Sequence, residues 1–414
     1  MKRWAGISVG VALAVAAGIA FYWFGPNLPR RASGPAIPDD AVTAFLATHW
    51  PDPLPPQGEP PPQFTALEAS LAPEACGQCH TEQFHDWRAS LHSQAVGPGL
   101  LWQFRLMDQQ AANSCMRCHA PLAEQKALMA IEHAWSAAPA TAPPAYVSTQ
   151  LHRQGLVCAA CHVRAHTRFG PPPRVVSSTP VPHGGFHAHM AFQDSRFCAG
   201  CHQFPESGTR LNGKLLENTY EEWRASRAAA AGQTCQSCHM PERRHLWRGI
   251  HDPQMTAAAL TATLEVGTVG TGRLRAQAHV TNTGAGHHFP TYVVPEVVLA
   301  LTLVDPRGRS GAEIARSVIA RRANIELTQE LSDTRIANGE SRVLAGEFVR
   351  PTEAGWRVEL RMSVHPGAHY ERSFRHALAG AGEMDRETQR LLREALARIE
   401  AGRYEVTLAR RRID

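Results

Sequence analysis

The pattern Cys-x-x-Cys-His occurs five times between residues 76 and 239 of this 414-residue chain. It is the attachment sequence of a c-type haem. Its two thiols, one helical turn apart, form thioether bonds with the two vinyl groups of one porphyrin, and the adjacent histidine brings an imidazole nitrogen to the iron. The motifs contain all ten cysteines of the chain: Cys76, Cys79, Cys115, Cys118, Cys158, Cys161, Cys198, Cys201, Cys235 and Cys238. The predicted proximal iron ligands are the histidines that follow, His80, His119, His162, His202 and His239.

Zinc sites and disulfides are the competing interpretations of so many cysteines. A structural zinc ion takes four ligands, whereas each motif offers three, with the histidine always in the same place. No cysteine lies outside a motif. We therefore expect five covalently attached haem c groups.

The formal charge of +5 and the isoelectric point of 8.7 would ordinarily suggest an acidic partner. That inference does not hold here, because five haems would bring ten propionates. The sequence also contains no nucleic-acid-binding motif. We expect no nucleic-acid partner.

An apolar run from about Ala5 to Phe24 follows two basic residues near the N-terminus. About 20 helical residues at 1.5 Å each span one bilayer core, and the run ends in aromatic residues typical of a membrane interface. We predict a transmembrane anchor over residues 1–25. A cleaved signal peptide, with Gly18 and Ala20 before the cut, is the alternative. Because c-type haems are attached outside the cytoplasmic membrane, the predicted location is the bacterial cytoplasmic membrane, with the body in the periplasm.

Small residues recur every fourth position in the predicted anchor, at Gly6, Gly10, Ala14 and Gly18. Such a stripe lets two transmembrane helices approach closely. It predicts a homo-oligomer or a partner helix, although Gly and Ala are common in such helices in any case.

The rest of the chain divides into three parts by composition. Residues 26–73 are rich in proline and predict an extended tether, with a short helical patch at Ala44–Trp50. Residues 74–252 form a mainly helical and loop pentahaem domain. Residues 253–414 alternate apolar and polar residues between turns, which predicts an antiparallel β-sandwich with a late helix and a closing strand. The predicted fold class is therefore α+β multidomain, with an N-terminal transmembrane helix.

Four helices are expected in the haem domain and six strands after it. The helices are Thr81–Ser93, Leu100–Gln110, Pro121–Trp135 and Glu217–Ala231. The strands are Leu260–Val266, Leu274–Val280, Val293–Val304, Val343–Phe348, Trp356–Val364 and Tyr404–Ala409, with a helix at Arg386–Glu400 before the last.

Several short sequence stretches around the motifs resemble those of a known family. They are Trp87-x-x-Ser90-x-His92, Asn218-Thr-Tyr-x-x-Trp223, Cys235-Gln-Ser-Cys238-His239-Met-Pro241 and Gly286-His287-His288-Phe289-Pro290. The sequence resembles, over residues 74–370, the multihaem cytochromes c grouped with the tetrahaem cytochrome c-554, as a pentahaem member with a C-terminal β-domain. The resemblance implies periplasmic electron transfer with mostly bis-histidine haems. The Cys-x-x-Cys-Lys variant that marks pentahaem nitrite reductases is absent.

A second imidazole on an iron gives a low-spin haem suited to electron transfer, and 17 of the 22 histidines lie outside the motifs. His92 is the first distal candidate, by the resemblance, with His85 as its alternative. The other candidates are His166, His187 (preferred to its neighbours His183 and His189), His245, His251, and His287 or His288. We interpret His49, His279, His365, His369 and His376 as surface or core residues.

Two functions remain open. The first is an electron carrier, tethered to the membrane, between a membrane electron donor and a periplasmic redox partner protein. The alternative is an oxidoreductase in which one haem iron lacks a second protein ligand and acts on a small nitrogen or sulfur compound. The surplus of histidines favours the carrier, and we predict no catalytic residue.

Overall fold

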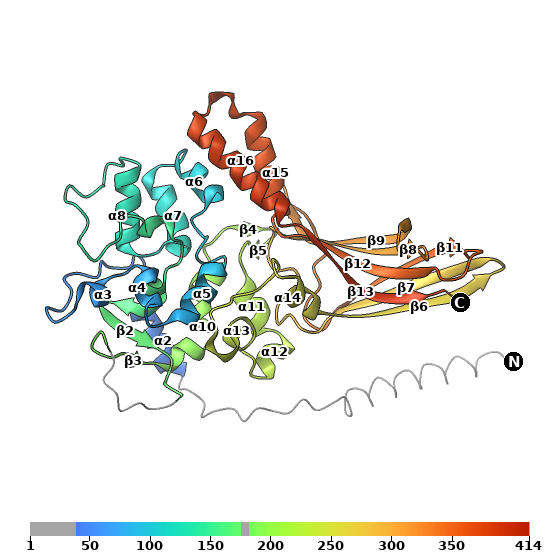
Figure 1. Cartoon of the computed structure of the whole chain (residues 1–414), viewed down its shortest axis with the longest axis horizontal. Helices are drawn as coiled ribbons and strands as arrows, with labels where there is room; N and C mark the ends of the chain where they lie inside the picture. The colour runs from blue at the N-terminus through green and yellow to red at the C-terminus, as the bar shows by residue number, and fades with distance from the viewer. Residues whose placement is uncertain (1–38, 175–181, 414) are drawn as a thin grey trace. The chain divides into compact units, whose positions relative to one another are not determined.

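The computed structural model describes residues 39–174 and 182–413, and Asp39–Asp414 form one compact unit. The first half consists of short helices joined by loops (Figure 1). Its helices are α2 Asp39–His49, α3 Ala66–Ala69, α4 Pro73–Gly77, α5 Thr81–Ala89, α6 Pro98–Phe104, α7 Gln109–His119, α8 Ala123–Glu132, α9 Cys158–His162, α10 Arg196–His202, α11 Thr219–Arg224, α12 Arg227–Ala230, α13 Cys235–His239 and α14 Pro253–Ala258, with 3₁₀ turns η1 Leu151–Arg153, η2 Met190–Gln193 and η3 Pro241–Arg243.

Each Cys-x-x-Cys-His motif lies on or beside one of these helices. Four motif histidines are the last residue of their helix, in α7, α9, α10 and α13. The fifth, His80, lies between α4 and α5 as the N-cap of α5. A spacing of three residues puts both thiols of a motif on one helix face, so the helical geometry suits attachment to a single flat group.

The four helices predicted in this half are present but shorter than expected. Trp87 closes α5 early, because its carbonyl accepts both the Ser90 amide (2.9 Å) and the Ser90 hydroxyl (2.7 Å). The long helix predicted at Glu217–Ala231 is two helices, α11 and α12, separated at Ser226, whose side chain caps α12. Serine favours caps because its hydroxyl competes with helical backbone bonds.

Residues 39–73 form part of the body, so the tether prediction is wrong for this stretch. Val42 and Leu71 are completely buried. The His49 side chain lies 2.8 Å from the Cys161 carbonyl, and the Gln57 amide donates to Glu124 at 2.6 Å. The prolines do extend the backbone here, but apolar residues between them anchor it to the haem-motif helices.

The second half is built from two antiparallel sheets that share one core (Figure 1). The larger has the order β10-β9-β8-β12-β13 and the smaller β11-β7-β6. The strands are β6 Leu260–Gly270, β7 Arg273–Asn282, β8 Glu296–Val304, β9 Ser310–Ala323, β10 Glu330–Asp333, β11 Ser341–Val349, β12 Arg357–His365 and β13 Tyr404–Arg412. Alternating residues of β7, Leu274 to Val280, face β8 and β12 and are nearly inaccessible. Short two- to four-residue strands, β1 Val163–Arg164, β2 Thr167–Gly170, β3 His187–Ala188, β4 Arg210–Leu211 and β5 Lys214–Leu215, lie in the first half.

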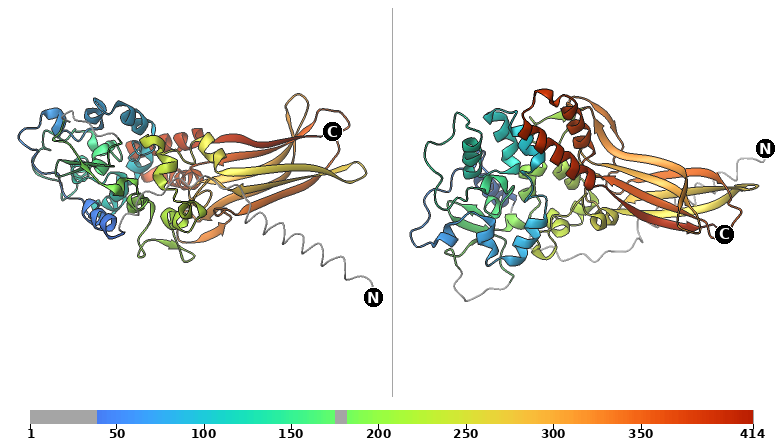
Figure 2. Two further views of the ribbon diagram at one scale, coloured as in Figure 1. Left: turned by 90° about the horizontal axis from the view of Figure 1, so that it is seen from below. Right: turned by 45° about the horizontal axis from the view of Figure 1, so that its top comes forward.

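A helical hairpin between β12 and β13 packs on the haem-motif half (Figure 2). It consists of α15 Ala368–Ala379 and α16 Arg386–Ala401, with a 3₁₀ turn, η4 Ala381–Glu383, between them. Phe374 and Leu392 join Phe104 of α6 and Met116 of α7 in one buried cluster. The sequence predicted α16, but not that it would cross to the second haem motif.

The prediction of a transmembrane helix, and the membrane localisation that rested on it, must be corrected. Within residues 39–174 and 182–413, no helix is long and apolar enough to cross a bilayer. The longest, α16, has 16 residues, about 24 Å at 1.5 Å per residue, and carries arginine and glutamate along one side. The predicted anchor at 1–25, with its Gly6, Gly10, Ala14 and Gly18 stripe, lies outside the described residues. The fold described here therefore contains no membrane-spanning helix.

Candidate haem sites

Several motif histidines are held by their second ring nitrogen. Nδ1 lies within hydrogen-bond distance of a backbone carbonyl in three of them: His119 with Ala95 (2.9 Å), His162 with Phe169 (2.8 Å) and His239 with Arg248 (2.6 Å). A ring whose Nδ1–H donates to a carbonyl keeps the Nε2 lone pair free for a metal. These rings are therefore oriented as iron ligands would be.

Three motif histidines face a second histidine at nearly the same separation. The ring centroids are 6.1 Å apart for His162 and His245, 6.3 Å for His202 and His92, and 6.4 Å for His239 and His287. An imidazole nitrogen lies about 2 Å from a transition metal, as for zinc. Two rings on opposite sides of one metal ion therefore have centroids about 6 Å apart, so all three pairs leave room for an iron between them.

Two of the three facing histidines are oriented by the same kind of contact, whereas the buried Nδ1 of His92 has no hydrogen-bond partner among the described residues. His245 Nδ1 lies 3.0 Å from the Arg243 carbonyl, and His287 Nδ1 lies 2.8 Å from the carbonyl of His288. With Nδ1–H as the donor, Nε2 of each of these rings carries the lone pair that a metal would bind. Burial lowers the pKa of His245 and of His287, which favours the neutral imidazole that a metal requires.

His80 of the first motif is near His183 rather than His187. Burial, and then the charge of His183, lower the pKa of His80. His183 has a positive φ of 51°, and its Nδ1 lies 2.9 Å from the Gly185 carbonyl, the same kind of contact as in His245 and His287. His187 is exposed and packs on Phe169.

The remaining candidates are not brought opposite a motif histidine. His166 is buried with its Nε2 already bound to the Gly58 carbonyl at 3.1 Å. His251 and His85 are exposed. In the described ranges, His119 forms no ring pair of the kind seen for His162, His202 and His239. Tyr370 stacks on Phe374 of α15, and its pKa is raised by burial first, then by the charges of Glu217 and Cys115.

Motifs that are distant in the sequence lie side by side. The thiols of Cys76 and Cys158 lie close enough together to shift each other's pKa, as do those of Cys118 and Cys201 and those of Cys198 and Cys235. The first motif is therefore next to the third, and the fourth is next to both the second and the fifth. A simple sequential row of one site per forty residues does not describe this arrangement.

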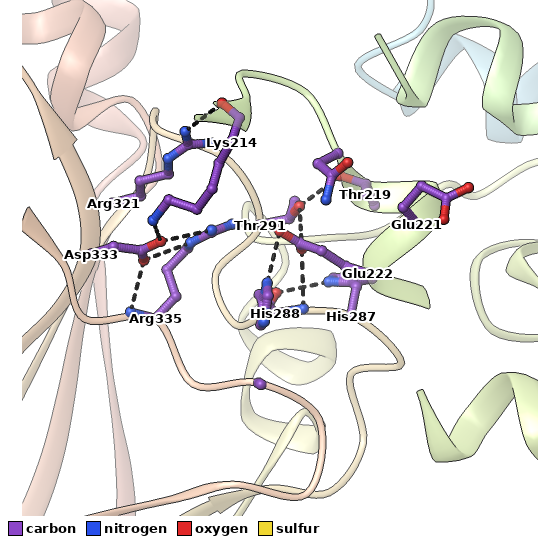
Figure 3. Close-up of polar contacts among 12 residues, drawn as sticks. Lys214, Thr219, Glu221, Glu222, His287, His288, Thr291, Arg321, Asp333 and Arg335 are labelled. Carbon is purple, nitrogen blue, oxygen red and sulfur yellow. Dashed lines mark hydrogen bonds and ion pairs between the residues drawn. The ribbon is translucent and has the colours of Figure 1, made fainter. Parts of the chain in front are cut away.

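A buried polar network fixes the loop that carries His287 (Figure 3). Glu222 of α11 accepts the His288 amide at 3.2 Å, and its carboxylate lies 2.7 Å from both His288 Nδ1 and the Arg335 guanidinium. Burial alone would raise the pKa of Glu222, but the His288 hydrogen bond and the charge of Arg335 outweigh it, and the pKa is lowered. The network extends through Asp333, Lys214 and Arg321, so the two halves of the body are tied together at this loop.

The residues present fit covalently bound haem c. Burial lowers the pKa of His80, His119 and His202, which favours the neutral imidazole that a metal requires. All ten cysteines are free. No group of three or more His, Cys, Asp or Glu side chains in the described part is arranged to hold a metal ion alone, so the zinc interpretation gains no support.

Comparison with solved structures finds a protein of the same fold. A penta-heme cytochrome c552 from Thermochromatium tepidum matches with a TM-score of 0.56 and 18% identity, covering 84% of this chain and 100% of that chain. A β-glucosidase from Paenibacillus barengoltzii matches 27% of this chain and 12% of its own at 17% identity, but its TM-score of 0.15 supports no inference. No protein-family model and no curated protein match the chain.

Proposed function

We propose that this protein is a multihaem cytochrome c that transfers electrons through five covalently attached haems. The observation that carries the proposal is the set of three histidine pairs with centroid separations of 6.1 to 6.4 Å, each with one member from a Cys-x-x-Cys-His motif. Fold similarity to a pentahaem cytochrome adds support. Haem c, when bound, supplies an iron that alternates between ferric and ferrous states.

The chain's own residues would have distinct tasks. The cysteines hold each porphyrin covalently. We assign His245, His92 and His287 as the distal ligands of the third, fourth and fifth motifs, and His183 as that of the first, with carbonyl-bound Nδ1 atoms fixing three of these four rings. Two imidazoles keep an iron six-coordinate in both oxidation states, so little structure moves when the electron does.

Neighbouring motifs would give the electron a path within the body. The close thiols join the first motif to the third, and the fourth to the second and fifth. One partner protein would donate at one end and another would accept. We also propose that this protein is related to the multihaem cytochromes c grouped with cytochrome c-554.

The second candidate, an oxidoreductase, is favoured by the second motif alone. His119 has no facing histidine among the described residues, and Tyr370 lies near Cys115 of the same motif. A tyrosine is a weaker ligand for a redox-cycling haem than an imidazole. An iron at this motif would therefore have a place for a small nitrogen or sulfur compound.

Two measurements test these functions together. Mass spectrometry of the purified chain should show five haem additions. Four or fewer in a fully matured sample would contradict the proposed number of attached haems. The ferric spectrum then separates the candidates. Only low-spin haem, with no binding of cyanide or carbon monoxide, supports the carrier. One high-spin haem in the wild type that binds one equivalent of cyanide or carbon monoxide supports the enzyme.

A further inference from the structure

Trp247 contacts two of the proposed distal ligands at once. Its ring centroid is 4.6 Å from that of His92, with the planes at 73°, and 4.9 Å from that of His245, at 84°. Both contacts have the edge-to-face geometry that aromatic rings prefer. The two histidines are the proposed distal ligands of the fourth and third motifs.

The fold holds Trp247 in this place against a local conformational cost. Its φ of 42° lies in the left-handed region that residues other than glycine rarely occupy. Its amide donates to the carbonyl of His239, a proximal histidine of the fifth motif, at 2.9 Å. A strained backbone that persists is fixed by its surroundings, and such positions cluster at functional sites.

The segment before Trp247 is fixed to α5 by one buried carboxylate. Asp86 accepts the His245 amide at 2.9 Å and the Arg244 guanidinium at 2.6 and 2.7 Å. On the other side, the His92 carbonyl accepts the Leu156 amide at 2.8 Å. Both imidazoles are therefore anchored through their backbones. The His245 ring is also held by the Arg243 carbonyl, whereas the buried Nδ1 of His92 has no hydrogen-bond partner among the described residues, so the indole is the contact that the two rings share.

We propose that Trp247 is a positioning residue shared by the haems of the third and fourth motifs. Its indole sets the plane of both distal imidazoles and fills the space between them. The orientation of an axial imidazole is set by the groups around it, and loss of an orienting partner typically costs ten- to a hundredfold in metal affinity or activity. The inference deepens the proposed electron-transfer function and depends on His92 and His245 being axial ligands.

The test compares Trp247→Leu and Trp247→Phe with the wild type, all as full-length holoprotein. Trp135→Leu is the matched control, because Trp135 is also half-buried and packs on a histidine, His133, with ring centroids 4.8 Å apart, and among the described residues that histidine forms no ring pair with a motif histidine. Mass spectrometry checks that each variant keeps the wild-type haem load. Electron paramagnetic resonance of the ferric protein then reports the orientation of each pair of axial rings.

In Trp247→Leu we expect two of the low-spin signals to shift and the others to stay in place. Internal electron exchange after flash reduction should slow by about tenfold, the lower end of the effect of losing an orienting partner. Trp247→Phe should shift the same two signals by less, and Trp135→Leu should shift none. A Trp247→Leu spectrum that superimposes on the wild type overturns the inference. If Trp247→Leu is recovered without its haems, an unchanged spectrum of Trp247→Phe overturns the inference instead.

Two further variants separate this inference from the function on which it rests. His92→Ala and His245→Ala should each convert one low-spin haem to high spin. If neither does, the axial assignment fails, and the role of Trp247 fails with it. If both do while Trp247→Leu changes nothing, only the inference about Trp247 is wrong.

Discussion

His239 and His287 face each other with ring centroids 6.4 Å apart and planes only 10° from parallel. His239 ends helix α13, whereas His287 lies in the loop after strand β7, so the pair joins the two halves of the body. Glu222 of α11 supports that loop through His288 and Arg335. One of the proposed haem sites is therefore complete only when the β-sheet half is in place.

We expect His287→Ala to leave all thioether bonds intact and to convert one haem from low to high spin, because the fifth-motif iron would lose an imidazole. New cyanide binding of one equivalent should accompany the change. His288→Ala is the neighbouring control: it loses the contact with Glu222 but keeps the ring opposite His239. A high-spin fraction that is equal in the two variants would contradict the assignment of His287.

The histidines before the fourth motif allow a second comparison of two variants, His183→Ala and His187→Ala. His183→Ala should produce one high-spin haem, since its Nδ1 is bound to a backbone carbonyl as in His245 and His287 and it lies close enough to His80 to lower the pKa of that ring. His187→Ala should leave the ferric spectrum unchanged, because that side chain is exposed. Absorption spectra of the two ferric variants decide the matter, and the opposite result would restore His187 as the ligand.

Local spacing made the haem motifs predictable, because a Cys-x-x-Cys-His motif needs only one helical turn. The partner rings were harder to place. His183, His187 and His189 are indistinguishable in sequence, and the positive φ of His183, which turns its ring, depends on tertiary contacts. His92, His245 and His287 were candidates from the sequence, but only folding shows which motif histidine each of them faces.

The β-strands were predictable where alternation was clean and were missed where a charge pointed inward. Strand β9 carries Arg321, which is 1% exposed and donates to Glu330 of β10 and to the Leu215 carbonyl. A buried arginine paired in this way breaks the apolar pattern by which a strand is recognised. The contacts of residues 39–73 were missed for a related reason, since prolines suggest an extended chain but do not show what it packs against.

The packing of the helical hairpin on the second motif predicts a large stability effect from one buried side chain. Leu392 of α16 is inaccessible and contributes to the cluster around Phe104 and Met116. Leu392→Ala should lower the free energy of unfolding by about 2–5 kcal/mol, as for other core leucines. Leu106→Ala makes the same chemical change at a side chain that is 56% exposed and should cost less than about 0.5 kcal/mol. Similar urea midpoints for the two variants would contradict this packing.

Glu132 at the end of α8 predicts a stability change at acid pH. Its carboxylate lies 2.6 Å from His152 Nε2 and accepts from Arg153 at 2.5 and 2.9 Å. The His152 hydrogen bond, followed by the Arg153 contacts, lowers its pKa from 4.5 to about 2, against the opposing effect of burial. Because the folded pKa is depressed, the ionised carboxylate stabilises the fold above pH 4.5, and this contribution is lost as the pH falls toward 2.

The side chain of Glu132 is 30% exposed. We therefore expect its ionised carboxylate to add about 1–3 kcal/mol to the free energy of unfolding at neutral pH, which is less than a pKa shift of this size would give in a fully buried site. Urea unfolding of wild type and Glu132→Gln, followed from pH 7 to pH 2, measures it. The wild type should be more stable by that amount at pH 7, and the two curves should converge as the pH falls from 4.5 to 2. Curves that stay parallel over this range would mean that Glu132 acts through packing and not through its charge.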